Sequence, residues 1–173
     1  WAIWISIISG IYCAIYALTI GAWTSASVLP GWHIIYVTFT ALPIYFIAGA
    51  KRSEFKNYCG SYAVGVIWGM LYLFVMDRCA ALGWPWWLNV GVVVAVLCTI
   101  ECAVHFCLPS WLPFNVVPAQ FGAISNTFWT SNLTIAVLGA GSSATAGFYN
   151  FKVLPITVIT LCTGALLALV CNE

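Results

Sequence analysis

The sequence predicts an all-α integral membrane protein: a polytopic bundle of about six transmembrane helices that forms a single domain over residues 1–173. Two observations predict this fold. Hydrophobic residues make up 64% of the chain and charged residues 5%, whereas a soluble domain carries about 25% charged residues. Eight of the nine charges lie where an apolar segment begins or ends. The uncharged stretches between them are long enough to cross a bilayer, which takes about 20 apolar residues.

Helices are predicted rather than a closed barrel, because the apolar runs do not alternate with polar residues. The uninterrupted segments cover about residues 3–20, 58–76, from the corner at 83–87 to 106, and 154–171. The first helix is followed by a turn at Pro30-Gly31. The second segment, about residues 32–50, contains Pro43, which is expected to kink or break the helix.

The stretch after the fourth helix is also expected to be broken. Pro109, Pro113 and Pro118 lie within ten residues of the chain, and polar residues follow them. A stretch this polar and this rich in proline does not suit an ordinary lipid-facing helix. Two interpretations stay open, a buried discontinuous span completed by residues 131–140 or a re-entrant hairpin. Residues 141–147 are expected to form a loop of small residues.

A short motif occurs once in each half of the chain. Pro43-Ile-Tyr-Phe46 and Pro118-Ala-Gln-Phe121 share a Pro-x-x-Phe pattern, and a loop with Phe-Lys follows each of them. A duplication would make residues 1–83 and 84–173 a 3+3 inverted repeat with broken second and fifth spans, which is the plan of many transporters. Against a duplication, the motif is short and its register slips in the final helices.

Basic residues indicate the orientation. Lys51, Arg52 and Lys56 place the loop between the second and third spans in the cytoplasm by the positive-inside rule. With six spans, both termini are then cytoplasmic. Lys152 is expected on the opposite side, so the rule is not obeyed everywhere.

The ninth charge, Glu101, lies near the end of the fourth segment. It is four residues from His105 and therefore on the same helix face. A carboxylate and an imidazole together could ligate a metal or relay protons. The alternative is a structural pair near the interface, bonded to each other or reaching toward water. No metal site is predicted, because one helix supplies only part of a ligand set.

Small residues recur at spacing four on the third and sixth helices. They are Ser61, Gly65 and Gly69 on the third helix, and Thr160, Gly164 and Ala168 on the sixth. Small residues let helix backbones approach closely in a membrane, where lipid supplies no hydrophobic driving force. Helix packing is therefore the expected role, and the other interpretation places Ser61 at the mouth of a pore.

The proline-containing segments carry the residues best suited to contact a solute. The candidates are Pro43, Phe46, Pro118, Gln120, Phe121, Ser125 and Asn126. Uncharged hydrogen-bonding groups beside aromatic rings suit a small neutral or weakly polar solute. The other interpretation is that these groups only satisfy backbone atoms freed by the prolines.

Four stretches resemble a family of small bacterial inner-membrane proteins, the domain-of-unknown-function family 1097. The stretches are Tyr45-Phe-Ile-Ala-Gly-Ala50, Gly65-Val-Ile-Trp-Gly69, Pro118-Ala-Gln-Phe-Gly122 and Lys152-Val-Leu-Pro155. The resemblance reaches across most of the chain and implies a compact multi-pass protein of the inner membrane, but no activity and no functional residue. The chain differs from that family by an insertion of roughly residues 131–149.

A small-solute membrane channel or transporter is the function that the sequence predicts. A homo-oligomer is expected, because about 170 residues do not easily build a gated carrier. The alternative is a non-transporting accessory or structural subunit of a larger membrane complex. No nucleophile elbow, phosphate loop or HExxH motif is present, so neither an enzyme nor a cofactor is expected. A net charge of +1 predicts no nucleic-acid partner, and membrane lipids are the expected surroundings.

Overall fold

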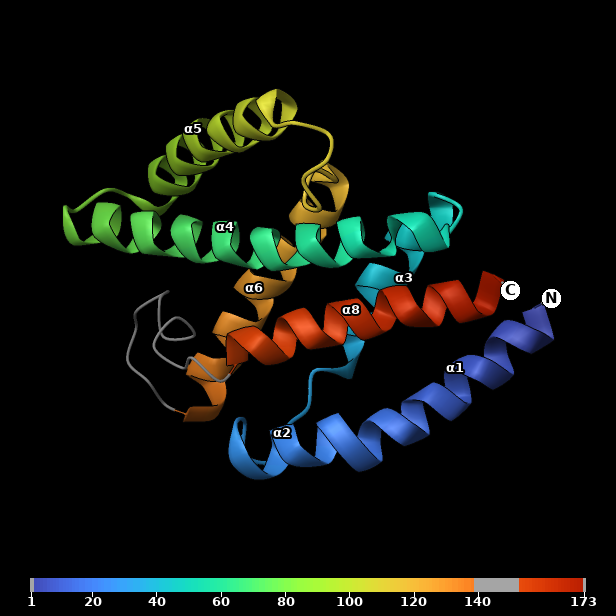
Figure 1. The fold of residues 1–173 in the computed structure, drawn as a ribbon. Coiled ribbons are helices and arrows are strands. Elements are labelled where there is room, and N and C mark those ends of the chain that lie inside the picture. Colours follow the sequence, from blue (N-terminus) through green and yellow to red (C-terminus); the bar gives the residue numbers. More distant parts are fainter. Residues whose placement is uncertain (1, 139–152, 173) are drawn as a thin grey trace.

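A computed structural model describes residues 2–138 and 153–172. All regular secondary structure in these residues is helical, which confirms the predicted class (Figure 1). Four helices are long and apolar enough to cross a membrane, at Ile3–Ser27, Arg52–Ala81, Trp86–Cys107 and Val153–Asn172. These helices fit an integral membrane protein, while the count of six spans stays a prediction.

The first helix is longer than expected. α1 (Ala2–Tyr16) continues through one turn of π-helix, η1 (Ala17–Gly21), into α2 (Ala22–Ser27), so the three form one continuous rod (Figure 1). Most apolar side chains of the rod are exposed, whereas Tyr16 is buried. The rod therefore lies at the edge of the bundle and offers most of its surface to lipid or to a neighbouring chain.

The second segment is only partly helical. Residues 32–34 are not helical, and the chain then forms η2 (Ile35–Val37) and α3 (Thr38–Ile47), which contains Pro43. These thirteen helical residues extend over about 20 Å, less than the roughly 30 Å of hydrocarbon in a bilayer. The segment ends at Gly49, whose positive φ of 87° suits glycine.

Two long helices follow. α4 begins after η3 (Arg52–Glu54) and covers Phe55–Ala81, and α5 covers Trp86–Cys107. α4 extends at both ends beyond its predicted apolar limits, because charged and polar residues near the interface remain good helix formers. Gly83, with a φ of 81°, makes the corner between α4 and α5.

The break expected in the fifth segment is wrong. α6 (Val117–Leu138) is one helix of 22 residues. Pro109 and Pro113 lie in the connection that precedes it, and Pro118 is its second residue. In the first turn of a helix the backbone N–H has no intrahelical partner, so proline costs nothing there. The loop expected at 141–147 lies outside the described residues, as does Lys152.

α4 and α8 (Val153–Asn172) occupy the centre of the bundle. α4 packs mainly on α6, and α3 packs mainly on α8. The outer helices follow the same order, since α5 covers α4 and α1 covers α8 (Figure 1). The two ends of the described chain lie at the same end of the bundle, where Asn172 Nδ2 donates to the Gly49 carbonyl at 3.2 Å.

Glycines on α4 set its approach to α6. A Cβ on Gly65 would lie 2.5 Å from the carbonyl oxygen of Gln120 and 2.7 Å from the Cβ of Ala123, and a Cβ on Gly69 would lie 2.7 Å from Thr127. No side chain fits at these distances, so the two backbones meet. One turn earlier, Ser61 Oγ accepts a hydrogen bond at 3.0 Å from the N–H of Val116, just before α6.

Gly164 has the same position between α8 and α3. Its Cβ would lie 2.5 Å from the carbonyl oxygen of Thr38 and 2.9 Å from the Cβ of Ala41. Thr160 and Ala168, one turn to either side of Gly164, are fully buried. Both stripes of small residues therefore lie where two helices approach each other closely.

Candidate functional site

One face of α5 carries the buried charge. The side chains buried on this helix are Asn89, Val93, Leu97, Glu101 and His105. Their spacing of four puts them in one stripe, which faces α4. Glu101 is 0% exposed and His105 is 5% exposed, so the end of the stripe near Cys107 places a carboxyl group and an imidazole inside the protein.

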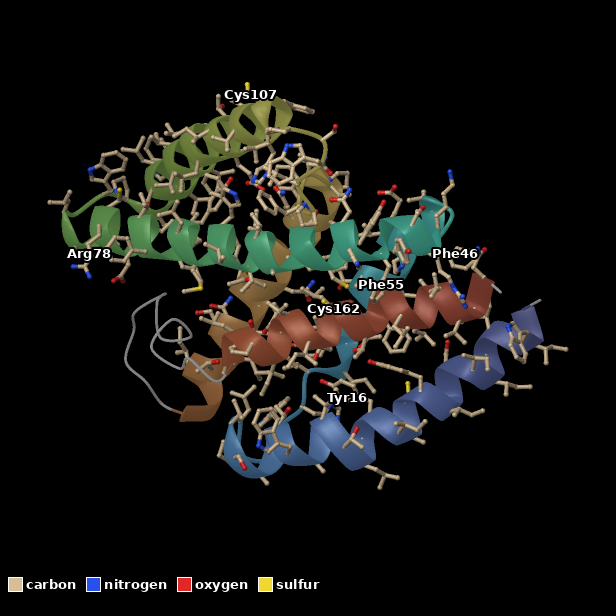
Figure 2. All side chains as sticks on the ribbon, viewed as in Figure 1. Tyr16, Phe46, Phe55, Arg78, Cys107 and Cys162 are labelled. Atoms are coloured by element: carbon tan, nitrogen blue, oxygen red, sulfur yellow. The ribbon has the colours of Figure 1, made fainter. Side chains whose placement is uncertain are left out.

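Residues from three helices meet at this end of the stripe. We call Trp68, Tyr72, Glu101, His105 and Gln120 the Glu101 cluster. α4 supplies the indole and the phenol, α5 the carboxyl and imidazole, and α6 the amide. In Figure 2 the space between α4 and α5 is filled with side chains from both helices.

Glu101 is incompletely hydrogen-bonded. Its Oε2 accepts a hydrogen bond at 3.2 Å from the hydroxyl of Tyr72. Its Oε1 is buried and has no hydrogen-bond partner among the described residues. The described Lys and Arg side chains are all exposed, so none of them accompanies Glu101 into the interior. A buried carboxylate in this state is costly unless another group neutralises it.

His105 lies between two N–H groups. The indole Nε1 of Trp68 donates to its Nε2 at 3.0 Å, and the amide Nε2 of Gln120 lies 3.1 Å from its Nδ1. The same Gln120 nitrogen donates to the carbonyl of Phe114 at 2.7 Å, which fixes it as a donor. A neutral imidazole accepts at one nitrogen and an imidazolium at neither. Because its Nε2 accepts from Trp68, His105 is neutral in this arrangement and does not compensate the charge of Glu101.

Of the roles that the sequence leaves open for Glu101 and His105, a direct hydrogen bond between the two side chains is not present. Both side chains lie on one face, as their spacing predicts, but each bonds to another helix instead. Gln120, predicted as a solute contact, bonds within the same cluster and is 0% exposed. Its Oε1 is buried and has no partner among the described residues. The cluster thus holds two buried oxygen acceptors, one on Glu101 and one on Gln120, that lack a donor.

Aromatic rings lie within the cluster and pack against it. The ring centroids of Trp68 and His105 are 6.2 Å apart, and those of His105 and Phe114 are 6.3 Å apart. Tyr72 meets the ring of Phe128 edge-on, with centroids 6.0 Å apart. Electrostatic interactions between groups buried in such surroundings are stronger than in water, because the effective dielectric constant is lower.

Three members of the stripe and cluster were missed by the sequence interpretation. Trp68 precedes Gly69 directly and Tyr72 follows it by three residues, and neither was considered a candidate site residue. Asn89 was missed as well, and its Nδ2 donates to the Met76 carbonyl at 2.7 Å while its Oδ1 has no partner among the described residues. The signal for Asn89 was available, because it lies twelve residues before Glu101 on the same helix face.

The junction of α1 with α3 and α8 uses different chemistry. The hydroxyl of Tyr12 lies 2.7 Å from Thr38 Oγ1 and 2.8 Å from Thr163 Oγ1. The hydroxyl of Tyr16, which lies between α1 and α8 in Figure 2, is 3.0 Å from Thr160 Oγ1. These hydroxyl groups are uncharged and hydrogen-bonded. An outer helix can therefore attach to this bundle without a buried charge.

The other predicted solute contacts lie outside the Glu101 cluster. Asn126 is buried, and its Nδ2 donates to the carbonyl of Gly122 one turn earlier at 2.8 Å. Ser125, Pro118 and Phe121 are exposed on α6. These side chains do not join Gln120 around a common site.

Pro43 and Phe46 lie at the outer surface. They line an apolar hollow of about 220 Å³ together with Ile5, Leu42, Ile47 and Cys171. A larger hollow of about 550 Å³ is lined by Gly31, Trp32, His33, Tyr36, Trp129 and Leu133, and it is also predominantly apolar. Neither hollow includes a residue of the Glu101 cluster. The described residues contain no group of three or more His, Cys, Asp or Glu side chains that could hold a metal ion.

No protein-family model, curated protein or solved structure matches this chain. The resemblance to the domain-of-unknown-function family 1097 therefore stays a prediction. The assignment of a function depends on the geometry of the Glu101 cluster.

Proposed function

We propose that this chain is a membrane transport protein for a small polar solute, and that the solute passes the Glu101 cluster. The observation that carries the proposal is the buried carboxyl group of Glu101, which has one hydrogen-bond partner among the described residues. Ionisable side chains inside membrane helices are costly, with about 2.5–3.5 kcal/mol on insertion scales for a central charge, and they mark solute, ion or proton pathways.

A comparison within the bundle supports a functional role for Glu101. Tyr12 and Tyr16 attach α1 with hydroxyl groups alone. α5 packs on α4 as α1 packs on α8, yet it brings Glu101 and His105 inside. Because packing does not require these two groups, their chemistry is the better reason for their presence.

We include the 3+3 inverted repeat in the proposal, but with a different alignment of the two halves from the one that equates Pro43 with Pro118. Gly65 contacts Gln120 and Ala123, and Gly164 contacts Thr38 and Ala41 at nearly the same distances. Equating residues 38–41 with 120–123 also pairs Phe39 with Phe121. The order of contacts supports the same relation, since α3 packs on α8 as α6 packs on α4. Transporters with inverted repeats bind their solutes near the interface of the two halves.

Location and assembly follow the sequence-based arguments. The two ends of the described chain lie beside the connection that carries Lys51, Arg52 and Lys56. The positive-inside rule therefore places both termini in the cytoplasm, and we propose the bacterial inner membrane as the location. We propose a homo-oligomer because the chain is short for a gated carrier.

Flux through proteoliposomes tests the transport function. Liposomes that contain the purified protein are mixed rapidly with a solution of ammonium chloride, methylammonium chloride, urea or glycerol, which imposes a concentration gradient of that solute. Stopped-flow light scattering follows the liposome volume, and a fluorescent dye follows the internal pH. We expect faster equilibration of at least one solute than in empty liposomes, and a loss of that rate in Glu101→Gln. Glu54→Gln is the matched control, because Glu54 is an exposed carboxyl in the connection before α4. Rates equal to those of empty liposomes for every solute contradict the proposal.

One observation favours the alternative, a non-transporting subunit. Asn126 and the amide nitrogen of Gln120 are bonded internally, and the surface hollows described above are lined by other residues. Purification from native membranes in a mild detergent separates the two functions. A fixed stoichiometry with other subunits, together with no flux in liposomes, supports the accessory role, whereas a homo-oligomer with flux supports transport.

A further inference from the structure

We propose that the Glu101 cluster binds a small cation that donates N–H hydrogen bonds, namely ammonium or a primary alkylammonium. This inference rests on the proposed transport function and names the solute class for that site. It replaces the neutral solute that the sequence favours with a cation. The reason is the pair of buried acceptors, Glu101 Oε1 and Gln120 Oε1, which have no donor among the described residues.

Charge is the first argument for a cation. Glu101 is fully buried, while the described Lys and Arg side chains are all exposed. Nε2 of His105 accepts a hydrogen bond from the indole N–H of Trp68, which only the neutral imidazole can do. A carboxylate in such surroundings lacks a counter-charge, and a bound monocation would supply it.

Hydrogen bonding is the second argument, and it selects among cations. The unpartnered atoms are both oxygen acceptors, so a ligand that satisfies them must donate. Ammonium and alkylammonium ions donate several N–H bonds, whereas potassium, which has nearly the size of ammonium, donates none. Charge-assisted hydrogen bonds to a carboxylate are about twice as strong as neutral ones.

The aromatic walls are the third argument. Trp68 and Tyr72 belong to the cluster, and the rings of Phe114 and Phe128 pack against His105 and Tyr72. Aromatic faces attract ammonium groups, most strongly where water is excluded. Aromatic rings do not stabilise an anion in this way. A strongly hydrated divalent ion would lose its water ligands and find too few oxygen ligands to replace them.

Binding to the purified protein tests the inference independently of transport. The thermal unfolding midpoint is measured in mild detergent at constant ionic strength, with ammonium, methylammonium, potassium or tetramethylammonium chloride, or with urea. A ligand that binds the folded state raises the midpoint in a saturable manner. We expect this rise with ammonium and methylammonium, and none with potassium or tetramethylammonium. Glu101→Gln should raise the dissociation constant for methylammonium at least about tenfold, and Glu54→Gln should leave it unchanged.

A second measurement covers the case in which Glu101→Gln does not fold. The chain contains three glutamates, Glu54, Glu101 and Glu173, so protein labelled with ¹³C at the glutamate carboxyl gives three NMR signals. Methylammonium should shift one of them over the concentration range that raises the midpoint, and potassium should not. The proposal is contradicted if methylammonium and potassium shift the same signals by equal amounts, because exposed carboxylates respond to any cation in this way.

Other outcomes separate this inference from the proposed function. An equal effect of potassium means that the cluster recognises charge alone, and stabilisation by urea that survives Glu101→Gln means that it recognises a neutral donor. Either result overturns the ammonium site while leaving transport standing. Selective methylammonium binding without flux in liposomes keeps the site and overturns transport.

Discussion

Glu101 and Tyr16 have comparable positions in the bundle but different side chains. Each lies on an outer helix and faces a central one, and each has one hydrogen-bond partner there. The hydroxyl of Tyr16 carries no charge, whereas a carboxylate at the same depth must be compensated. Packing alone therefore does not explain a glutamate at position 101. The property to measure is whether its carboxyl group is charged or neutral in the folded protein.

Removal of the Tyr72 hydroxyl tests whether Glu101 is charged in the folded protein. Tyr72→Phe deletes the described hydrogen bond to Glu101 and keeps the ring. For a charged acceptor the expected loss of stability is about 1.5–3 kcal/mol. Tyr16→Phe is the matched control and should cost about 0.6 kcal/mol, the average for a neutral bond between membrane helices. Denaturation in detergent micelles measures both, and equal losses would show that Glu101 is uncharged in the folded protein.

Sequence spacing placed Glu101 and His105 on one face, but it did not find their partners. Spacing along a helix fixes which side chains share a face, since the period of the helix is known. The partners Trp68 and Gln120 come from other helices, and where they lie along the axis of α5 depends on how α4 and α6 pack. That packing depends on glycine contacts between helices, which no single-segment pattern specifies.

At the scale of elements, α6 shows how a polar segment stays helical in a bundle. Thr127, Thr130 and Thr134 are buried, and each hydroxyl donates to the carbonyl four residues earlier at 2.7–2.9 Å. The polar groups are thus satisfied within the helix and need neither water nor a break in the chain. One side of α6 is buried and the other is exposed, and the positions of the prolines before the helix and in its first turn explain why it is continuous.

Replacement of Pro118 distinguishes a continuous helix from a broken one. In the first turn of α6 the proline ring removes no intrahelical hydrogen bond. We therefore expect Pro118→Ala to change the unfolding midpoint and the solute flux little. Loss of flux in this variant at unchanged stability would instead indicate that the proline shapes a discontinuous span.

Replacement of glycine tests the contacts between helices. A Cβ at Gly65 meets the backbone of α6, which cannot move aside as a side chain can, so Gly65→Ala is expected to cost at least about 1–3 kcal/mol. Gly164→Ala should behave alike at the α3–α8 contact. Gly91→Ala on α5 is the control, because nothing lies within 4 Å of its added Cβ. A Gly65→Ala protein as stable as the Gly91→Ala protein contradicts the packing of α4 on α6.

At the scale of the whole molecule, the sequence predicted the class but not the pairing of its helices. Nine charges were enough to divide the chain into membrane-sized segments. The register of the two halves was assigned from Pro43 and Pro118, which are exposed residues under little packing constraint. The spacing of small residues identified Gly65 and Gly164 as packing positions, but it did not indicate that Gly65 meets α6 and that Gly164 meets α3.

The orientation of the bundle is the remaining whole-molecule prediction. Cys107 is exposed at the end of α5, and the connection after it bonds to the start of α4, where the N–H of Asn115 donates to Asn57 Oδ1 at 3.2 Å. That end carries Lys51, Arg52 and Lys56, whereas Arg78 lies at the other end of α4 (Figure 2). We therefore expect Cys107 to face the cytoplasm.

Labelling with a membrane-impermeant maleimide measures this orientation. In a variant that keeps Cys107 and replaces the other seven cysteines with alanine, inverted vesicles should be labelled and spheroplasts should not. Leu82→Cys in a cysteine-free background should show the opposite pattern, because Leu82 is 77% exposed in the corner between α4 and α5. Labelling of both positions from the same side contradicts a membrane-spanning α5. Reversal of both patterns keeps the spans but places the basic connection outside, against the charge rule that predicts the orientation.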